Sequence, residues 1–176
     1  MDKVSYKNKN TIIKQNLDIN FRRYPLVNDR DNVYNLLAGT GFFSKEELDT
    51  AVELIDEKLQ LDEKSSYRFI FAESESILIG YTCYGHIPLT KSSFDLYWIA
   101  VNVKYQDHGI GQIIMSQTEA SIRLSGGTAM YADTSSREQY HPTRKFYQSC
   151  GFREAAYFRD FYAPGDGKIV FAKNLI

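Results

Sequence analysis

The spacing of apolar residues predicts a well-defined helix in the first third of the chain. Ser44 and Glu47 form an S-x-x-E pattern, in which each side chain can cap the other residue's backbone N–H at a helix start. Apolar residues then recur at the spacing of one helical face: Leu48, Ala51, Val52, Ile55 and Leu59. A shorter helix is expected before it, because Asn28 can act as an N-cap and Gly39–Gly41 can interrupt the helix.

Other stretches have the composition of strands. Residues 94–103, FDLYWIAVNV, are nearly continuously apolar and rich in aromatic and β-branched side chains, which predicts a central strand covered on both faces. Residues 67–72 and 77–84 are expected to form a hairpin. Pro164 and Gly165 stand at the central positions of a type II turn. Further strands are expected at 21–26, 129–133, 152–162 and 168–174.

Two more helices complete the pattern. One is expected from about residue 109 to 124, and the other from about 142 to 150, where Pro142 suits a first turn because its missing N–H is not needed there. The resulting order, β-α-α-β-β-β-α-β-α-β-β, combines alternation with hairpins and predicts an α/β (α+β) fold with a mixed sheet. At 176 residues the chain fits one domain, expected over residues 21–176 behind a polar lead-in at 1–20.

Composition and charge exclude several classes of protein. The 21 basic and 22 acidic side chains give a net charge of -1, which argues against broad electrostatic binding of nucleic acid. Cys83 and Cys150 form no C-x-x-C pair and the three histidines are dispersed, so neither a disulfide scaffold nor a metal site is expected. The polar N-terminus lacks a signal-peptide pattern, and no apolar run approaches about 20 residues. We therefore expect a cytoplasmic protein that does not enter membranes.

Aromatic residues are unusually frequent, with 13 Tyr, 11 Phe and 1 Trp. This number is more than a core of this size requires. The aromatic side chains therefore either pack the core and the surface or also line a binding pocket, and composition alone leaves both alternatives open.

Residues 106–112 join the predicted central strand to the following helix and contain two glycines. N–H groups at a helix start bind anions, and Gly109 and Gly111 allow a phosphate to approach the backbone closely. The Walker A pattern is absent, and the third glycine of a Rossmann loop would fall at Ile114. Asp133 lies near the distance of a Rossmann ribose-binding acid, which keeps a dinucleotide-binding protein open as an alternative, although few residues remain for such a domain.

Gln106-x-x-Gly109-x-Gly111 resembles the acetyl-CoA pyrophosphate loop of the GNAT N-acetyltransferase superfamily. Residues 144–152, RKFYQSCGF, are similar to the second signature of that family, Phe-Tyr-x-x-x-Gly-Phe. The resemblance is specific over residues 94–152, looser over the final hairpin and weak near the N-terminus. It implies a GNAT-like fold, with a mostly antiparallel sheet flanked by about four helices. It also implies an enzyme that uses acetyl-CoA as co-substrate and needs no metal.

The resemblance further implies which residues bind acetyl-CoA. Backbone N–H groups of the loop would hold the pyrophosphate, and main-chain groups of the central strand would pair with pantetheine, one of them polarising the thioester carbonyl. Tyr140 replaces an Asn that many members have, and Thr134, Ser135 or Ser136 could take over its contacts. The residues implied are Ile99, Ala100, Val101, Gln106, Asp107, His108, Gly109, Ile110, Gly111, Gln112, Thr134, Ser136 and Phe146.

Two side chains are candidates for proton transfer. Tyr147 occupies the position of the tyrosine that protonates the CoA thiolate in many GNAT enzymes. Without the resemblance, Tyr147 would be interpreted as a tyrosine on the buried face of a helix. Asp95 shares a strand face with apolar residues, where desolvation would raise its pKa and suit a general base. The alternatives are that Asp95 is a solvated residue at a strand start and that ordered water serves as the base.

The acceptor side is expected to be aromatic. In the family, the acceptor is bounded by the loop between the first two helices and by the last hairpin, which here carry Phe42, Phe43, Tyr157, Phe158, Phe161 and Tyr162, with Arg159 and Asp160. The candidate acceptor-binding residues are Phe42, Phe43, Phe161 and Tyr162, together with Tyr97 of the central strand. Such a site suits a small amine, an amino acid or a peptide N-terminus as the partner. The predicted reaction is transfer of the acetyl group of acetyl-CoA to a primary amine. The main alternative is a catalytically silent GNAT-fold module that binds acyl-CoA or a protein, and assembly as a homodimer is also left open.

Overall fold

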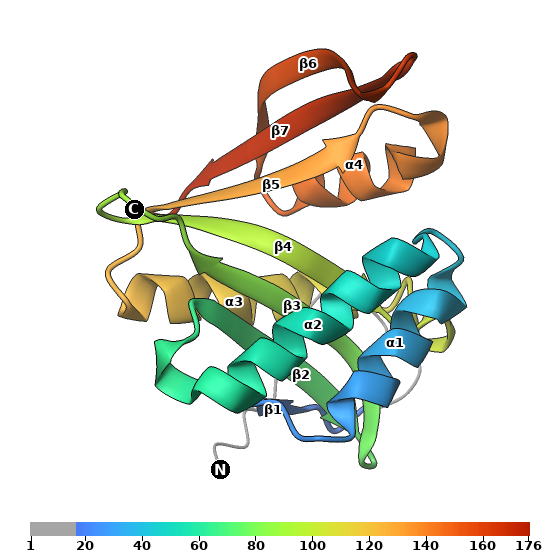
Figure 1. The fold of residues 1–176 in the computed structure, drawn as a ribbon, viewed down its shortest axis with the longest axis vertical. Coiled ribbons are helices and arrows are strands. Elements are labelled where there is room, and N and C mark those ends of the chain that lie inside the picture. Colours follow the sequence, from blue (N-terminus) through green and yellow to red (C-terminus); the bar gives the residue numbers. More distant parts are fainter. Residues whose placement is uncertain (1–16) are drawn as a thin grey trace. The chain divides into compact units, whose positions relative to one another are not determined.

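The computed structural model describes residues 17–176 and contains the predicted elements in the predicted order (Figure 1). The helices are α1 (Asp29–Thr40), α2 (Lys45–Leu61), α3 (Ile110–Leu124) and α4 (His141–Ser149). The strands are β1 (Asn20–Arg22), β2 (Tyr67–Ser74), β3 (Ile77–His86), β4 (Ser93–Val101), β5 (Ala129–Ser135), β6 (Arg153–Ala163) and β7 (Asp166–Asn174). Most of the predicted polar lead-in, residues 1–16, lies outside the described residues.

The strands pair in the order β1-β2-β3-β4-β5-β7-β6. β4 and β5 run parallel, whereas β1–β2, β5–β7 and β6–β7 are antiparallel. A parallel pair needs a crossover connection, and α3 supplies it between β4 and β5. The predicted fold class, an α/β protein with a mixed, mostly antiparallel sheet and flanking helices, is confirmed. None of the helices formed by residues 17–176 has the length and apolar character of a membrane span.

The capping box at Ser44 forms as predicted. The Ser44 hydroxyl accepts a hydrogen bond from the Glu47 N–H (3.3 Å), and the Ser44 N–H donates to the Glu47 carboxylate (2.7 Å). α2 therefore begins at Lys45. α1 ends later than predicted, because Gly39 lies within it and Gly41, with a φ of 71°, takes the left-handed conformation that ends the helix.

The β2–β3 hairpin is tighter than predicted. Glu75 and Ser76 have φ values of 51° and 65°, which are typical of a two-residue type I′ turn, so β2 continues through Ser74. The turn at Pro164 and Gly165 has the predicted glycine in the left-handed region, with a φ of 81°. Both hairpins are therefore fixed by local backbone geometry.

Two strand predictions are wrong in detail. β1 ends at Arg22 instead of residue 26. The chain then turns toward α1, where the Arg22 side chain and the Leu26 N–H both donate hydrogen bonds to the Asp29 carboxylate. β4 has the predicted cover on both faces only over its last residues, where Trp98 and Ala100 pack with the larger of the two apolar clusters described below, and Ile99 and Val101 with the smaller. Over Ser93–Tyr97 the side chains alternate between a packed face, with Phe94 and Leu96 buried, and a more open face, where Tyr97 is 39% exposed.

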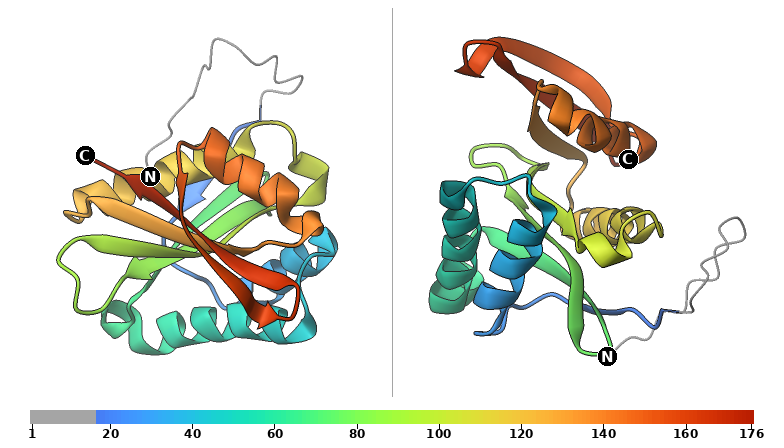
Figure 2. Two further views of the ribbon diagram at one scale, coloured as in Figure 1. Left: turned by 90° about the horizontal axis from the view of Figure 1, so that it is seen from above. Right: turned by 90° about the vertical axis from the view of Figure 1, so that its right-hand side faces the viewer.

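The chain divides into two compact units, and the first comprises the residues up to Cys83 together with Trp98–Ile114. Within it, α1 and α2 pack on one face of β2 and β3, and the first turn of α3 packs on the other (Figure 2). The larger of the two apolar clusters includes Val33, Leu37, Ile55, Phe69, Phe71 and Tyr81. The smaller cluster is formed by Ala72, Ile79, Ile110 and Ile114.

The second unit comprises Tyr84–Tyr97 and Met115–Ile176. The register of β4, β5 and β7 gives it one packed face, whose residues are Phe94, Leu96, Met130, Ala132, Ile169 and Phe171. α4 covers part of this face, since the ring centroids of Tyr147 and Phe171 are 5.5 Å apart. The alternate face carries residues that are half-buried or exposed, namely Asp95, Tyr131, Asp133 and Lys168.

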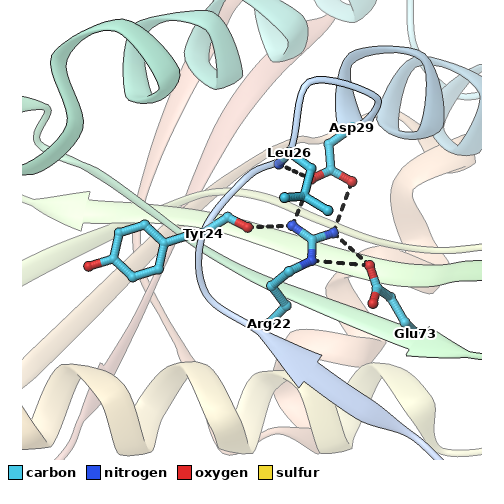
Figure 3. Close-up of polar contacts among 5 residues, drawn as sticks. All are labelled: Arg22, Tyr24, Leu26, Asp29 and Glu73. Atoms are coloured by element: carbon cyan, nitrogen blue, oxygen red, sulfur yellow. Dashed lines mark hydrogen bonds and ion pairs between the residues drawn. The ribbon is translucent and has the colours of Figure 1, made fainter. Parts of the chain in front are cut away.

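A buried ion-pair network joins β1, α1 and β2 (Figure 3). Asp29 is fully buried, and its carboxylate accepts hydrogen bonds from Arg22 Nη1 (2.7 Å), from Arg22 Nη2 (3.0 Å) and from the Leu26 N–H (2.6 Å). Arg22 Nη2 also donates to Glu73 (2.6 Å), and the guanidinium lies 4.4 Å from the centroid of the Phe71 ring. A buried charge without a partner destabilises the fold, so removing either Arg22 or Asp29 would leave the other as an uncompensated buried charge.

Asp29→Ala is expected to lower the free energy of unfolding by about 3 to 5 kcal/mol, because it leaves the largely buried Arg22 guanidinium without its main partner. Urea denaturation followed by circular dichroism measures this loss. Asp49→Ala, which removes an exposed i,i+4 pair with Lys45, is the control and should leave the midpoint nearly unchanged. Equal effects of the two substitutions would contradict the structural role of the network.

Tyr81 is fully buried, and its hydroxyl has no hydrogen-bond partner within the described part of the chain. Tyr81→Phe is therefore expected to keep the stability or to raise it by about 1 kcal/mol, since it removes an unsatisfied polar group. The matched control is Tyr84→Phe, because the equally buried Tyr84 donates a hydrogen bond to the Ser121 hydroxyl (2.7 Å). Thermal unfolding should rank Tyr84→Phe as the less stable variant, and the reverse order would refute this interpretation.

Candidate functional site

The main chain at the end of β4 presents different groups to its two edges. The Asn102 N–H donates to the Ile79 carbonyl on β3 (2.9 Å), so the backbone of Asn102 is turned toward β3. Because main-chain groups alternate along a strand, those of Ile99 and Val101 are turned to the opposite edge. At that edge the Gln106 side-chain amide donates to the Val101 carbonyl (3.0 Å). Three residues were predicted to pair with pantetheine. The main-chain groups of Ile99 and Val101 face away from β3, whereas those of Ala100 face toward it.

The glycine loop leads from β4 into α3. Asp107 and Gly109 have φ values of 61° and 76°, and the Ile113 N–H donates to the Gly109 carbonyl (3.1 Å) at the start of the helix. The N–H groups of Ile110 and Gly111 belong to the first turn, where a helix provides no acceptor for them. A Cβ atom at Gly109 would meet nothing within 4 Å. Exposed backbone, left-handed residues and a helix start together give this loop, called the cradle below, the features of an anion-binding site.

Side chains of the loop lie at its surface. Gln106, Asp107 and His108 are exposed, and His108 Nδ1 lies 2.5 Å from the Gln106 carbonyl oxygen. Gln112, in the first turn of α3, is also exposed. The loop therefore offers its backbone, and the buried Ile110 fixes its end to the core.

Gly80 on β3 permits the close approach of α3. A Cβ atom at Gly80 would lie 2.6 Å from Ile114 Cδ1 and 2.9 Å from the Ala100 carbonyl oxygen. A larger residue would therefore force the Ile114 side chain to move and would press on the Ala100 backbone. The position of the loop thus depends on a glycine outside the loop motif.

Tyr147 is packed among aromatic rings on α4. The ring centroid of Phe152 is 5.6 Å away and that of Phe171 is 5.5 Å away, and Tyr147 is 6% exposed. Burial, and next the charges of Asp133 and Cys150, raise the pKa of the Tyr147 phenol well above its usual value. The phenol therefore stays protonated at neutral and moderately alkaline pH, so it can donate a proton but cannot serve as a base.

Asp95 lies on the open face of the second unit with Asp133 and Lys168. Its partner across β4–β5 is Tyr131, so Asp133, two residues further along β5, is a diagonal neighbour on the same face. Lys168 on β7 forms an ion pair with Asp133, and its Nζ lies 4.9 Å from the centroid of the Phe161 ring. Partial burial, and next the charge of Asp133, raise the pKa of Asp95, while Lys168 opposes this shift. A carboxylate with a raised pKa is suited to accept a proton.

The predicted acceptor residues fall into two groups. In the first unit, the Phe43 ring contacts Trp98 edge to face at 5.2 Å and packs on the core, while Phe42 is more exposed. In the second unit, about half of Phe161 and of Tyr162 is exposed, and their ring centroids are 5.0 Å apart. Tyr97, on β4, is exposed as well. Exposed aromatic rings are available to a ligand, whereas Phe43 chiefly completes the core.

The predicted substitutes for the family Asn take part in local structure. The Ser136 hydroxyl accepts a hydrogen bond from the Gly167 N–H (2.8 Å), and Thr134 is buried. Tyr140, which stands where many members have Asn, lies 5.5 Å from the Arg137 guanidinium, measured to the ring centroid. Phe146 on α4 is half-buried. Residues 17–176 contain no group of three or more His, Cys, Asp or Glu side chains that could hold a metal ion.

Two charged residues beside Asp95 were missed by the sequence analysis. Asp133 was interpreted only as a possible ribose-binding acid. Side chains alternate between the two faces of a strand, so Asp133 shares a face with Tyr131, which is paired with Asp95. Lys168 carried no signal, because its contact with Asp133 depends on the pairing of β5 with β7. Long-range register brings the three charges together.

The comparisons identify the family of this chain. The GNAT acetyltransferase domain family matches residues 65–154. A protein from Desulfovibrio desulfuricans assigned to the GNAT acetyltransferases is 39% identical, with a TM-score of 0.88 over 90% of this chain and 99% of that chain. The protein therefore belongs to the GNAT acetyltransferase family. A Rossmann domain, the alternative that Asp133 left open, does not agree with this fold.

More distant solved structures share the fold. The ribosomal-protein-S18-alanine N-acetyltransferase of Escherichia coli is 16% identical, with a TM-score of 0.71 over 89% of this chain and 94% of that chain. An aminoglycoside 6′-N-acetyltransferase complexed with coenzyme A is also 16% identical, with a TM-score of 0.70 over 89% of this chain and 97% of that chain. At these identities the likeness concerns the fold alone. No curated protein matches the chain.

Proposed function

We propose that the protein is an N-acetyltransferase that moves the acetyl group of acetyl-CoA to a primary amine. The observation that carries the proposal is the cradle at the start of α3, where first-turn N–H groups of Ile110 and Gly111 accompany the open space at Gly109. A pyrophosphate needs several N–H donors and a close approach to the backbone, and this cradle offers both. Membership of the GNAT family supports acetyl-CoA as the molecule that carries the pyrophosphate.

In this proposal, binding of acetyl-CoA is shared between the loop and β4. Backbone N–H groups of residues 106–112 hold the pyrophosphate, and the main chain of Ile99 and Val101 pairs with pantetheine. Phe146, Thr134 and Ser136 remain proposed contacts of acetyl-CoA. Bound acetyl-CoA supplies a thioester, whose carbonyl carbon can be attacked by an amine and whose sulfur leaves as a thiolate.

The proton transfers are assigned to two residues of the second unit. Tyr147 donates its phenolic proton to the leaving thiolate, and its raised pKa keeps that proton in place at the pH of the reaction. Asp95 accepts a proton from the acceptor amine, and its raised pKa brings it closer to that of a useful base. Water between Asp95 and the amine would allow the same transfer over a longer distance.

The acceptor is proposed to be a small amine, an amino acid or a peptide N-terminus. Exposed rings of Phe161 and Tyr162 offer aromatic surface, and Asp95 offers a carboxylate without an ion-pair partner among the described residues, which together suit an amine. Two enzymes of the same fold are named for acceptors of this kind, an aminoglycoside and the alanine of a ribosomal protein. We therefore expect nitrogen rather than oxygen to be acetylated.

The deciding experiment is a turnover screen with acetyl-CoA over a panel of amines, amino acids and peptides, with release of free CoA as the readout. Acetylation of an amine, verified by mass spectrometry, would support the proposal. Calorimetric binding of acetyl-CoA without turnover on any member of the panel would favour the silent module instead. Failure to bind acetyl-CoA would refute both functions.

Gly109→Val is expected to raise the Kd for acetyl-CoA about tenfold or more, because a β-branched residue is strained at a φ of 76° and would fill the cradle. Isothermal titration calorimetry gives the two affinities. Gly126→Val is the matched control, since Gly126 has a φ of 79° and equally open surroundings beyond the end of α3. Unchanged affinity in Gly109→Val, or an equal loss in both variants, would contradict the assignment of the loop.

Tyr147→Phe is expected to lower kcat about 100-fold while the Kd for acetyl-CoA stays nearly constant, because it removes a general acid and keeps the ring that packs on Phe152 and Phe171. Steady-state kinetics and calorimetry separate the two quantities. Because the pKa of the phenol is raised, Tyr147 should cause no loss of wild-type activity up to about pH 10. A kcat equal to that of the wild type would remove the acid role.

A further inference from the structure

An ion pair stands beside the proposed base on the open face of the second unit. Lys168 on β7 is paired with Ser135 on β5, so Asp133, two residues before Ser135, shares its face. The two side chains form an ion pair in which 22% of the Lys168 side chain and 41% of the Asp133 side chain are exposed. The lysine is thus the more buried partner, and a buried ammonium needs the carboxylate.

Lys168 is held in place by a second contact. Its Nζ lies 4.9 Å from the centroid of the Phe161 ring, within the range of a cation–π interaction. Phe158 is paired with Lys168 across β6–β7, and the ring centroids of Phe158 and Phe161 are 6.3 Å apart. An ammonium held by a carboxylate and a ring is a fixed charge and not a freely moving surface lysine.

β5 carries Asp133 between Lys168 on one side and Asp95 on the other. Asp95 is paired with Tyr131, so Asp133 is its diagonal neighbour, with Cα atoms about 8 Å apart by standard sheet spacing. The part of β3 in this unit contributes two titratable side chains: Tyr84, whose hydroxyl donates to Ser121 on α3, and His86, whose ring contacts Phe94 on the packed face. The charged groups that act on Asp95 from the neighbouring strands are therefore Asp133 and Lys168.

We propose that Asp133 and Lys168 are positioning residues for the proposed general base, and that their two opposite charges set the pH range in which Asp95 accepts a proton. The negative charge of Asp133 opposes ionisation of Asp95, and the positive charge of Lys168 favours it. Because the two charges are paired, a change in either one leaves the other uncompensated beside Asp95. The catalytic part of this inference rests on the proposed function. The effect of the two charges on Asp95 does not depend on it.

The test uses two substitutions that remove one charge each and predict opposite results. Lys168→Met removes the cation and exposes Asp95 to Asp133, so the pKa of Asp95 should rise and the acid limb of kcat/KM should move to higher pH. Asp133→Asn removes the like charge, so the acid limb should move to lower pH. We expect shifts of about half a pH unit, since the charges act through partly solvated surroundings. Lys168→Arg keeps the charge and should leave the limb where it is in the wild type.

A second readout does not depend on turnover. Titration of the Asp95 side-chain carboxyl carbon by NMR, assigned with Asp95→Asn, should show the same opposite displacements in Lys168→Met and Asp133→Asn. A merely structural role would destabilise both variants without moving the carboxyl titration in opposite directions, and that result would overturn the inference. If the carboxyl titration moves as expected but Asp95→Asn keeps the acid limb of kcat/KM, the charge pair stands and the assignment of Asp95 as base fails.

Discussion

A backbone N–H that donates to a neighbouring strand is not available to a ligand, and the arrangement of β4 follows from this constraint. β4 is paired with β5 over Ser93–Leu96 but continues to Val101. Beyond Leu96, the register of the described strands gives its outer edge no partner from β5. The Gln106 amide donates a hydrogen bond to the Val101 carbonyl at that edge. A ladder extended to Val101 would also use the Val101 N–H and the main-chain groups of Ile99, which in the proposed function pair with pantetheine.

The second constraint is the period of two along a strand. On one face of the second unit, apolar side chains and the aromatic rings around Tyr147 exclude water, which keeps the Tyr147 phenol protonated. On the other face, Asp133 and Lys168 form an ion pair, and Asp95 lies on the same face, half-buried. One sheet thereby provides a dry environment for a proposed acid and a partly wet, charged environment for a proposed base.

Glycines place the cradle from two distant parts of the chain. Gly109 lets the loop adopt a left-handed turn at the start of α3, as its motif predicts. Gly80 lets α3 approach β3, since a Cβ atom there would collide with Ile114 and with the Ala100 carbonyl. The first role can be seen in a local pattern, whereas the second depends on which helix covers this part of the sheet.

Local physics made several features predictable from the sequence. The Ser44–Glu47 capping box, the turn at Gly165 and the loop at Gly109 each depend on residues a few positions apart. A short stretch of sequence is therefore enough to predict them. The order of the elements, and with it the fold class, followed from the same short-range periods. The family resemblance added the candidate roles of Tyr147 and of the loop.

Tertiary structure alone decided which distant charges meet. Arg22 and Glu73 are 51 residues apart and their contact depends on the pairing of β1 with β2, just as the contact of Asp133 with Lys168 depends on that of β5 with β7. The open face of β4 is of the same kind, because an apolar run does not say which of its faces another element will cover. Periodicity fixes the face on which a side chain lies, whereas register and packing, which are long-range, fix what it faces.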